Sequence, residues 1–178
     1  VGCVASLSGT HLVNMPLRPA SHRGRFVDKD NDGFYFRGGS ATVDRCVVMH
    51  TLDDCVDTAS SKGDPMHSTL AITRSVLANC QHEGVALSAS VGTKRSVTVS
   101  ETLFRWVQQG VEVGYTPATH DAVFDKCDFL DNAIGVRYGD NYKLAVSGAL
   151  NVTRSTFRRN GIDVLDHVKK ERGKAAWH

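Results

Sequence analysis

The sequence predicts an all-β solenoid in which short strands stack in successive coils, and three observations support this fold class. The 178 residues include 22 Val against 12 Leu and 3 Ile, and β-branched Val fits a pleated strand better than a helix. Short runs such as Ser96-Val97-Thr98-Val99 alternate with the period of a strand, and runs with a helical period are scarce. Two short phrases also recur about every 25 residues along most of the chain.

The first phrase is a short alternating strand that opens with glycine, or once with cysteine. It begins at Gly33, Cys55, Gly84, Gly110, Gly135 and Gly161, at intervals of 22, 29, 26, 25 and 26 residues. The second phrase has an apolar residue, a small residue three positions later and an apolar residue two beyond. Its instances are Val43/Cys46/Val48, Ile72/Ser75/Leu77, Val99/Thr102/Phe104, Phe124/Cys127/Phe129 and Val152/Ser155/Phe157. Such a repeat cannot bury its apolar face alone, so we expect about six coils of roughly 25 residues, stacked about 4.8 Å apart. A β-sandwich would also explain several short strands, but not the near-constant interval.

These phrases resemble the coils of right-handed parallel β-helix proteins, the superfamily that includes pectate lyases and polygalacturonases. The resemblance covers about residues 30–165 and implies a single domain over 1–178, with an N-terminal coil or cap at 1–29 and a C-terminal cap or tail at 166–178. The stretches Asp53–Asp57, Glu83–Ala86 and Gly135–Asp140 are most similar in flow to bacterial surface or secreted β-helix repeat proteins. That similarity implies an extracellular or cell-surface module with a binding or structural role.

The residues just before each first phrase fall in one row when the coils are aligned, and the row begins with acidic residues. It reads Asp32, Asp53-Asp54, His82-Glu83, Gln108-Gln109, Ile134 and Asn160. Stacking would place its first three levels roughly 5–10 Å apart, which covers the carboxyl separations used in glycoside hydrolysis. Neighbouring carboxylates also raise one another's pKa, which suits one of them to act as a general acid. The alternative interpretation is that polar residues flank the strands because turns face water.

Three stretches of this row resemble the polygalacturonases, which carry Asn-Thr-Asp, Asp-Asp-Cys and Gly-His-Gly ahead of successive strands. The corresponding stretches here are Asp30-Asn31-Asp32, Asp53-Asp54-Cys55 and Gln81-His82-Glu83. The resemblance implies that Asp32, Asp53 and Asp54 supply the acid and water-activating carboxylates and that His82 tunes them. The family's Arg-Ile-Lys on the following coil is replaced by Glu112-Val113-Gly114, and the glycine before the histidine is replaced by Gln81.

Candidate substrate-binding residues accompany this row and one of the longest connections, Gly139–Ser147. Insertions in a solenoid usually gather on one face, which is often the binding face. Aromatic rings could stack on sugars and cations could hold acidic groups, and the candidates are Glu83, Arg137, Tyr138, Tyr142 and Lys143, with Trp106 and Tyr115 as further aromatic residues. Ordinary core or loop packing is the alternative.

We therefore expect a carbohydrate-interacting or structural module whose partner is a polysaccharide or glycan surface, with further β-helix coils or domains of a longer chain as other partners. The alternative is an enzyme that hydrolyses or cleaves an acidic polysaccharide.

A second interpretation concerns the run from Asp28 to Gly33, in which acidic residues alternate before a glycine. Carboxylates at every second position can converge on a hard cation, as at the start of a calcium-binding loop. Asp28, Asp30 and Asp32 would be the Ca²⁺ ligands. The twelfth position is Gly39, where an EF-hand requires Glu, so a solvated turn is the other interpretation.

Cysteine content and charge give further expectations. No two of the five cysteines form a Cys-x-x-Cys pair, and Cys46 and Cys127 occupy the small-residue position of coils too far apart for a disulfide. We interpret the cysteines as buried small residues. The formal net charge of +2 lacks the basic excess of a nucleic-acid-binding protein. No apolar run approaches the roughly 18 residues of a membrane-spanning helix, and the first residues do not resemble a signal peptide.

Overall fold

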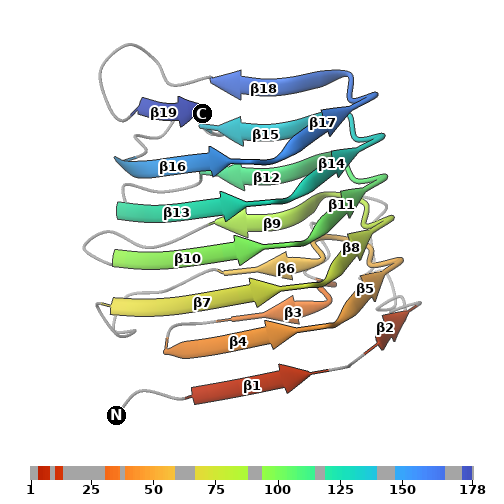
Figure 1. The fold of residues 1–178 in the computed structure, drawn as a ribbon. Coiled ribbons are helices and arrows are strands. Elements are labelled where there is room, and N and C mark those ends of the chain that lie inside the picture. The colour runs from red at the N-terminus through yellow and green to blue at the C-terminus, as the bar shows by residue number, and fades with distance from the viewer. Residues whose placement is uncertain are drawn as a thin grey trace, which may run out of the picture.

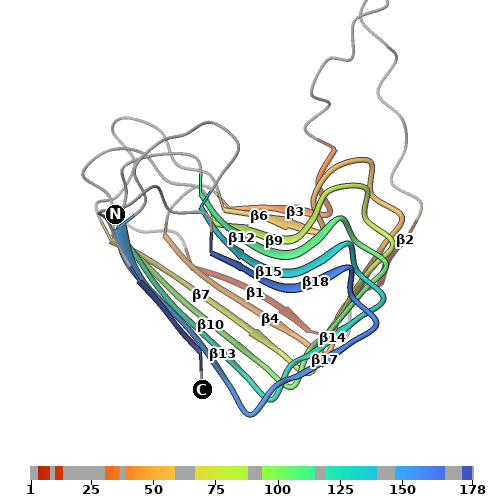
Figure 2. The same ribbon diagram turned by 90° about the horizontal axis from the view of Figure 1, so that it is seen from above.

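The computed structural model describes residues 4–8, 11–13, 31–36, 39–58, 67–87, 94–114, 119–139, 147–166 and 174–177. These residues form a parallel β-helix built from three sheets, with no helical segment among them (Figure 1). Each strand pairs in parallel with the strand of the same sheet in the next turn, and the view along the stack shows the turns lying over one another (Figure 2). The predicted fold class is confirmed.

Each turn contributes one strand to each sheet, in the order sheet A, sheet B, sheet C. Sheet A consists of β1 (Val4–Ser8), β4 (Ser40–Asp44), β7 (His67–Thr73), β10 (Lys94–Ser100), β13 (Thr119–Asp125), β16 (Ser147–Thr153) and β19 (Lys174–Trp177). Sheet B consists of β2 (His11–Val13), β5 (Val47–Met49), β8 (Val76–Ala78), β11 (Leu103–Arg105), β14 (Asp128–Leu130) and β17 (Thr156–Arg158). Sheet C consists of β3 (Phe34–Tyr35), β6 (Val56–Asp57), β9 (Glu83–Leu87), β12 (Gln109–Val113), β15 (Ile134–Tyr138) and β18 (Ile162–Asp166).

Four of the expected six coils are regular turns, with strands of seven, three and five residues in sheets A, B and C. They run from β7 to β18. In the two coils that precede them, the sheet C strands β3 and β6 have only two residues each. The expectation of about six equal coils is therefore corrected to about four regular turns.

The recurring phrases form the buried core because equivalent residues stack in register. Val43, Ile72, Val99, Phe124 and Val152 are successive partners in sheet A. In sheet B, Phe129 stacks between Phe104 and Phe157, with ring centroids 4.8 Å and 4.9 Å away. Stacking of equivalent apolar side chains supplies the burial that no coil achieves alone.

The glycine that opens the first phrase is required by close packing between turns. A Cβ atom at Gly84 would lie 2.6 Å from the backbone oxygen of Gly110 and 2.6 Å from the Phe104 ring in the next turn. Gly110 and Gly135 meet the equivalent oxygen and ring one turn further on. Glycine recurs at this position because the phenylalanine rings and backbone of the next turn leave no room for a side chain.

The last coil is offset from the alignment that the sequence suggested. Ile134 pairs with Ile162 and Val136 with Val164, so the sixth phrase lies two residues out of register with the fifth. Asn160 therefore lies opposite Asn132, whose backbone N–H donates to the Asn160 side chain at 3.0 Å, and not opposite Ile134. The row of residues that the sequence aligned from Asp32 to Asn160 therefore ends at Ile134, one coil earlier than expected.

The cysteines are only partly as predicted. Cys46 and Cys127 are free thiols with exposed fractions of 1% each, in agreement with their place at the small-residue position. Cys55 and Cys80, in contrast, form a disulfide with a Cα–Cα distance of 5.6 Å. The interpretation of these two as simple buried residues is wrong. Their separation of 25 residues matches the coil length, which is the sequence signal that would have indicated a bridge between adjacent turns.

Candidate functional site on the outer face of sheet C

Strand alternation in sheet C separates a core face from an outer face. Val85, Val111 and Val136 are fully buried on the core side. The next residue along each strand points to the opposite face, and these residues are Asp57, Ala86, Glu112, Arg137 and Leu165, which pair in register. The acidic row that the sequence indicated precedes the same strands. The outer row of sheet C therefore contains the polar residues Asp57, Glu112 and Arg137, beside the row of acidic residues.

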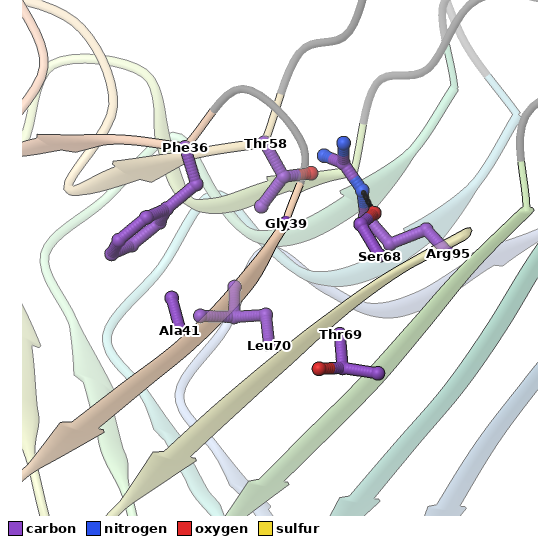
Figure 3. A pocket seen from close by; sticks show the side chains of 8 residues that line it. All are labelled: Phe36, Gly39, Ala41, Thr58, Ser68, Thr69, Leu70 and Arg95. Atoms are coloured by element: carbon purple, nitrogen blue, oxygen red, sulfur yellow. Dashed lines mark hydrogen bonds between the residues drawn. The ribbon is translucent and has the colours of Figure 1, made fainter. Parts of the chain in front are cut away.

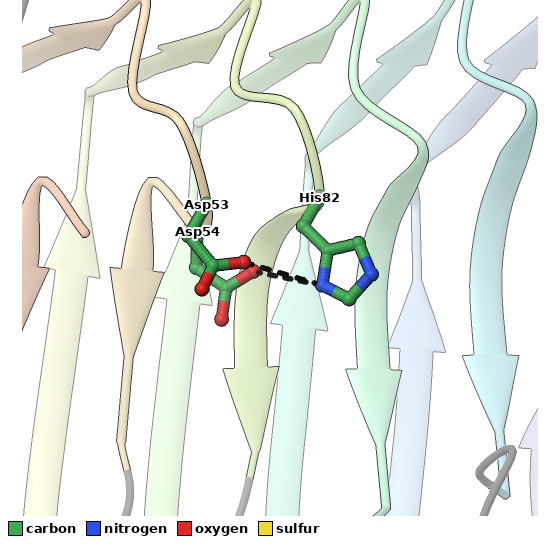
Figure 4. Close-up of side chains that lie close together, drawn as sticks. All are labelled: Asp53, Asp54 and His82. Atoms are coloured by element: carbon green, nitrogen blue, oxygen red, sulfur yellow. Dashed lines mark ion pairs between the residues drawn. The ribbon is translucent and has the colours of Figure 1, made fainter. Parts of the chain in front are cut away.

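Four side chains meet where β6 and β9 begin, and we call them the carboxyl cluster: Asp53, Asp54, His82 and Glu83. The Nδ1 atom of His82 lies 2.7 Å from Glu83 Oε2, 3.4 Å from Asp53 Oδ1 and 3.8 Å from Asp54 Oδ1. Figure 4 shows both aspartates directed at this edge of the imidazole. Asp53 and Asp54 lie in the loop before β6. In the next turn, His82 lies in the loop before β9 and Glu83 is the first residue of β9. Stacking of the coils thus brings together residues about 29 positions apart.

Backbone hydrogen bonds fix the carboxyl groups of the first three levels. Asp32 Oδ1 accepts from the backbone N–H of Asp54 at 3.1 Å. Asp54 Oδ1 in turn accepts from the backbone N–H of Glu83 at 2.8 Å. Each acidic side chain therefore holds the start of the strand in the following turn, and the predicted row from Asp32 through Asp54 to Glu83 lies in adjacent levels.

Burial changes the protonation of this row. Desolvation raises the pKa of Asp54 far above its ordinary value, and the hydrogen bond and charge of Glu83 raise it further. Desolvation also raises the pKa of Glu83, with a contribution from the charge of Glu112. A buried carboxyl pair joined by a hydrogen bond favours one shared proton, because ionising both would place like charges together in a low dielectric. Asp54 and Glu83 accordingly retain a proton at neutral pH.

Access to the carboxyl cluster is graded. The side chain of His82 is 47% exposed and that of Asp53 is 14% exposed, whereas those of Asp54 and Glu83 are 10% and 3% exposed. A molecule that approaches the outer face of sheet C therefore meets His82 and Asp53 first. The proton-sharing pair lies beneath them.

A polar network links Glu83 to the next two turns. Gln109 Nε2 donates to Glu83 Oε1 and, at 3.2 Å, to Glu112 Oε2. Arg137 Nη1 donates to Gln109 Oε1 at 3.3 Å and lies 3.8 Å from Glu112 Oε1. The Arg137 side chain is only 6% exposed, so its guanidinium supports the network from within. The sequence placed Gln109 in the aligned row but gave it no role, and it did not indicate Glu112 as part of the site.

The other predicted substrate-binding residues lie away from this surface or outside the described residues. Tyr138 is fully buried, and its hydroxyl donates to the backbone oxygen of Gly148 at 3.1 Å. Tyr142 and Lys143 lie outside the described residues, as does Tyr115. Trp106 is 51% exposed at the corner between sheets B and C, with the Arg105 guanidinium 3.8 Å from its ring centroid.

One exposed aromatic residue beside the cluster was not predicted. Tyr35 is 52% exposed and pairs in register with Asp57 on sheet C. It belongs to the same row as Glu112 and Arg137, on the outer face. The alternation Phe34-Tyr35-Phe36 was the signal that could have placed it there.

The metal-binding prediction concerned Asp28, Asp30 and Asp32. The first two lie outside the described residues, and Asp32 accepts the Asp54 backbone bond. Among the described residues, ligand atoms of Asp53, Asp54 and His82 lie within 4.8 Å of one another. That set includes an imidazole, which suits transition metals better than calcium. Calcium binding stays a prediction.

A separate pocket lies between the end of β6 and the start of the sheet A strands (Figure 3). Its floor is apolar and includes Phe36, Ala41 and Leu70. Arg95 lines it at 3% exposure, and its Nε donates to Ser68 Oγ at 2.9 Å. No member of the carboxyl cluster lines this pocket.

Comparison of this chain with protein-family models, with curated proteins and with solved structures finds no match. The parallel β-helix therefore rests on the observed strand pairing, and the resemblance to polygalacturonases rests on three short stretches. Within the described residues, no helix has the length and apolar character needed to cross a membrane.

Proposed function

We propose that the carboxyl cluster hydrolyses glycosidic bonds in a polysaccharide that lies across the outer face of sheet C. The observation that carries this proposal is the meeting of three carboxyl groups within 3.8 Å of His82 Nδ1. Two of the three are buried and share a proton, and the third is more accessible. Glycoside hydrolysis requires one protonated and one ionised carboxyl group at a single bond, and the proposal assigns the second role to Asp53.

The arrangement assigns a role to each group. Asp54 retains a proton with the help of Glu83 and donates it to the leaving oxygen of the glycosidic bond. Asp53 is the carboxylate that acts at the anomeric carbon, and His82 holds it in place. Oxygen atoms of Asp53 and Asp54 lie within 4.8 Å of each other, so the two carboxyl groups are closer than the roughly 6.5–9.5 Å of inverting glycosidases. The proposal therefore includes retention of anomeric configuration.

The charge of the outer face favours a neutral or amino-sugar polymer over a polymer of uronic acids. Glu112 adds a further carboxyl group beside the cluster. The guanidinium of Arg137 is buried against Gln109 and Glu112, where it cannot receive a substrate carboxylate without leaving them. Repulsion between a uronate and this face would oppose binding. Tyr35 offers an exposed ring on the same face for stacking against a sugar.

The disulfide supports an extracellular or cell-surface location. Structural disulfides form and persist in oxidising compartments and are rare in the cytosol. Cys55 and Cys80 are 0% and 2% exposed, as expected of a structural bridge. We therefore place the proposed activity outside the cell.

A second candidate is a carbohydrate-binding or structural module without turnover. The low exposure of Asp54 and Glu83 favours this candidate, because a general acid must reach the leaving oxygen. Tyr35 and His82 would then contact the sugar, and the buried carboxyl pair would only stabilise the coil junction.

A polysaccharide panel distinguishes the two candidates. Wild-type protein is incubated with neutral, amino-sugar and uronate polymers, and new reducing ends and unsaturated products are measured. We expect reducing ends without unsaturated products on a neutral or amino-sugar polymer, and a loss of at least about 100-fold in Asp53→Asn and Asp54→Asn. Asp121→Asn is the matched control, since Asp121 lies in sheet A and pairs with Lys94 at 2.7 Å.

Turnover of no substrate, or equal turnover by Asp54→Asn, would overturn the hydrolase proposal. Retained glycan binding under those conditions would support the second candidate.

A further inference from the structure

We propose that the Cys55–Cys80 disulfide is a positioning element for the carboxyl cluster, because it links the loop that carries Asp53 and Asp54 to the segment that carries His82 and Glu83. The role in catalysis rests on the proposed hydrolase function. The role in holding the two loops together does not, and it can be measured independently.

The bridge lies at the base of the cluster. Cys55 directly follows Asp54, and Cys80 precedes His82 by two residues. The bridge spans a Cα–Cα distance of 5.6 Å between adjacent turns. Every member of the cluster is therefore within three residues of a cysteine of the bridge.

Backbone hydrogen bonds join the same two segments. The N–H of His82 donates to the Asp53 oxygen at 3.3 Å, and the N–H of Gln81 donates to the Thr51 oxygen at 3.2 Å. The Cys55 N–H, beside the bridge, donates to the Glu83 oxygen at 2.8 Å. The disulfide thus adds a covalent link to a junction that backbone hydrogen bonds also hold.

Later turns build the same junction without cysteine. Sheet C pairing places Gly84 and Gly110 at the position equivalent to Cys55, and sheet B pairing places Val107 and Asn132 at the position equivalent to Cys80. At Asn132 a side-chain amide closes the corner, since its Oδ1 accepts from the Val107 N–H at 3.1 Å. Among the described turns, the disulfide lies at the junction that carries the carboxyl cluster.

Burial makes the disulfide a permanent structural link. With exposed fractions of 0% and 2%, the sulfur atoms are closed to an attacking thiolate in the folded protein. A neighbouring carboxyl pair that carries negative charge would also repel such a thiolate. The disulfide therefore fixes the distance between the two loops and is not a reversible switch.

The test replaces the bridge with the residues at the equivalent positions of the next junction, Gly84 and Val107, in the variant Cys55→Gly with Cys80→Val. The matched control is Cys46→Ala with Cys127→Ala, which removes two equally buried sulfur atoms that form no disulfide. Amide hydrogen exchange is followed by NMR on the full chain. We expect exchange at the His82 and Glu83 amides to accelerate by at least about tenfold relative to the Phe129 and Val136 amides, and no such difference in the control.

Equal acceleration throughout the chain, or unchanged exchange at His82 and Glu83, would overturn the proposal. If the glycine variant does not fold, Cys55→Ala with Cys80→Val gives the same comparison with a more restricted backbone. With a substrate in hand, we expect the bridge-free variant to lose kcat at least about tenfold with little change in KM, because geometry and not binding is affected. A hydrolase failure leaves the exchange result intact, so the two proposals fail separately.

Discussion

The buried imidazole of His120 should make the protein less stable in mild acid. His120 is fully buried on β13, and neither ring nitrogen has a hydrogen-bond partner. Desolvation, together with the nearby charge of Arg95, lowers its pKa to about 4. In the unfolded chain the same group titrates near 6.5. Between these values the unfolded state binds a proton that the folded state does not.

The sign and size of the effect follow from that difference. As the pH falls from 6.5 to 4, the unfolded state is increasingly favoured, and the folded state loses about 3 kcal/mol of stability relative to a protein without this group. His120→Phe removes the titratable ring and the two unpartnered nitrogens while keeping a ring of similar size. We therefore expect the variant to equal or exceed the wild type at pH 7 and to exceed it by a further few kcal/mol near pH 4.

The assay is urea unfolding of both proteins at several pH values, followed by circular dichroism. The quantity of interest is the wild-type value minus the variant value, because Asp57 and the buried carboxyl pair change the stability of both proteins alike. Val123→Phe, on the exposed face of the same strand, is the control for adding a ring. A difference that stays constant between pH 7 and pH 4 would refute the reasoning.

Three further changes test other parts of the structure by urea unfolding. Gly84→Ala should destabilise by about 1–3 kcal/mol, because the new Cβ would lie 2.6 Å from a backbone oxygen of the next turn; an unchanged midpoint would contradict the packing described. Asp57→Asn should become more stable relative to the wild type as the pH rises from 4 to 8, because burial and the charges of Asp54 and Asp32 raise the Asp57 pKa to about 8. The difference in unfolding free energy should be at most about 5 kcal/mol. A difference that grows towards low pH would contradict this prediction. Lys126→Gly should stabilise by about 1 kcal/mol, because Lys126 has a φ of 53°, a conformation that glycine adopts without steric cost. Loss of stability there would mean that its ion pair with Glu101 outweighs the backbone strain.

The sequence was informative where the structure depends on local repetition. Val85, Val111 and Val136 were aligned correctly because intervals of 26 and 25 residues separate them and similar residues surround each. The acidic row was found for the same reason: it keeps a constant distance from the glycine phrase. These features need only the coil length, which a single sequence displays.

Features that depend on contacts between different phrases were not found. The offset of the last coil arises because Gly161 imitates the phrase but lies opposite Ala133, and strand pairing is set by Val136 with Val164. Tyr138 was expected at a binding surface, yet it continues the inward alternation that begins at Val136. The location of Arg137 within a hydrogen-bonded network depends on Gln109 in another turn. No local pattern reports such a partner.

The most direct test of the account is the protonation of the Asp54–Glu83 pair, since the proposed chemistry requires a carboxyl group that keeps its proton at neutral pH. Side-chain carboxyl carbons of wild-type protein and of Asp54→Asn can be titrated by ¹³C NMR. We predict that the wild type retains one protonated carboxyl group in this pair at pH 7. We predict that the signal of this protonated carboxyl group is absent from the spectrum of the variant. Ionisation of both Asp54 and Glu83 below about pH 5, as in ordinary exposed carboxyl groups, would contradict the account.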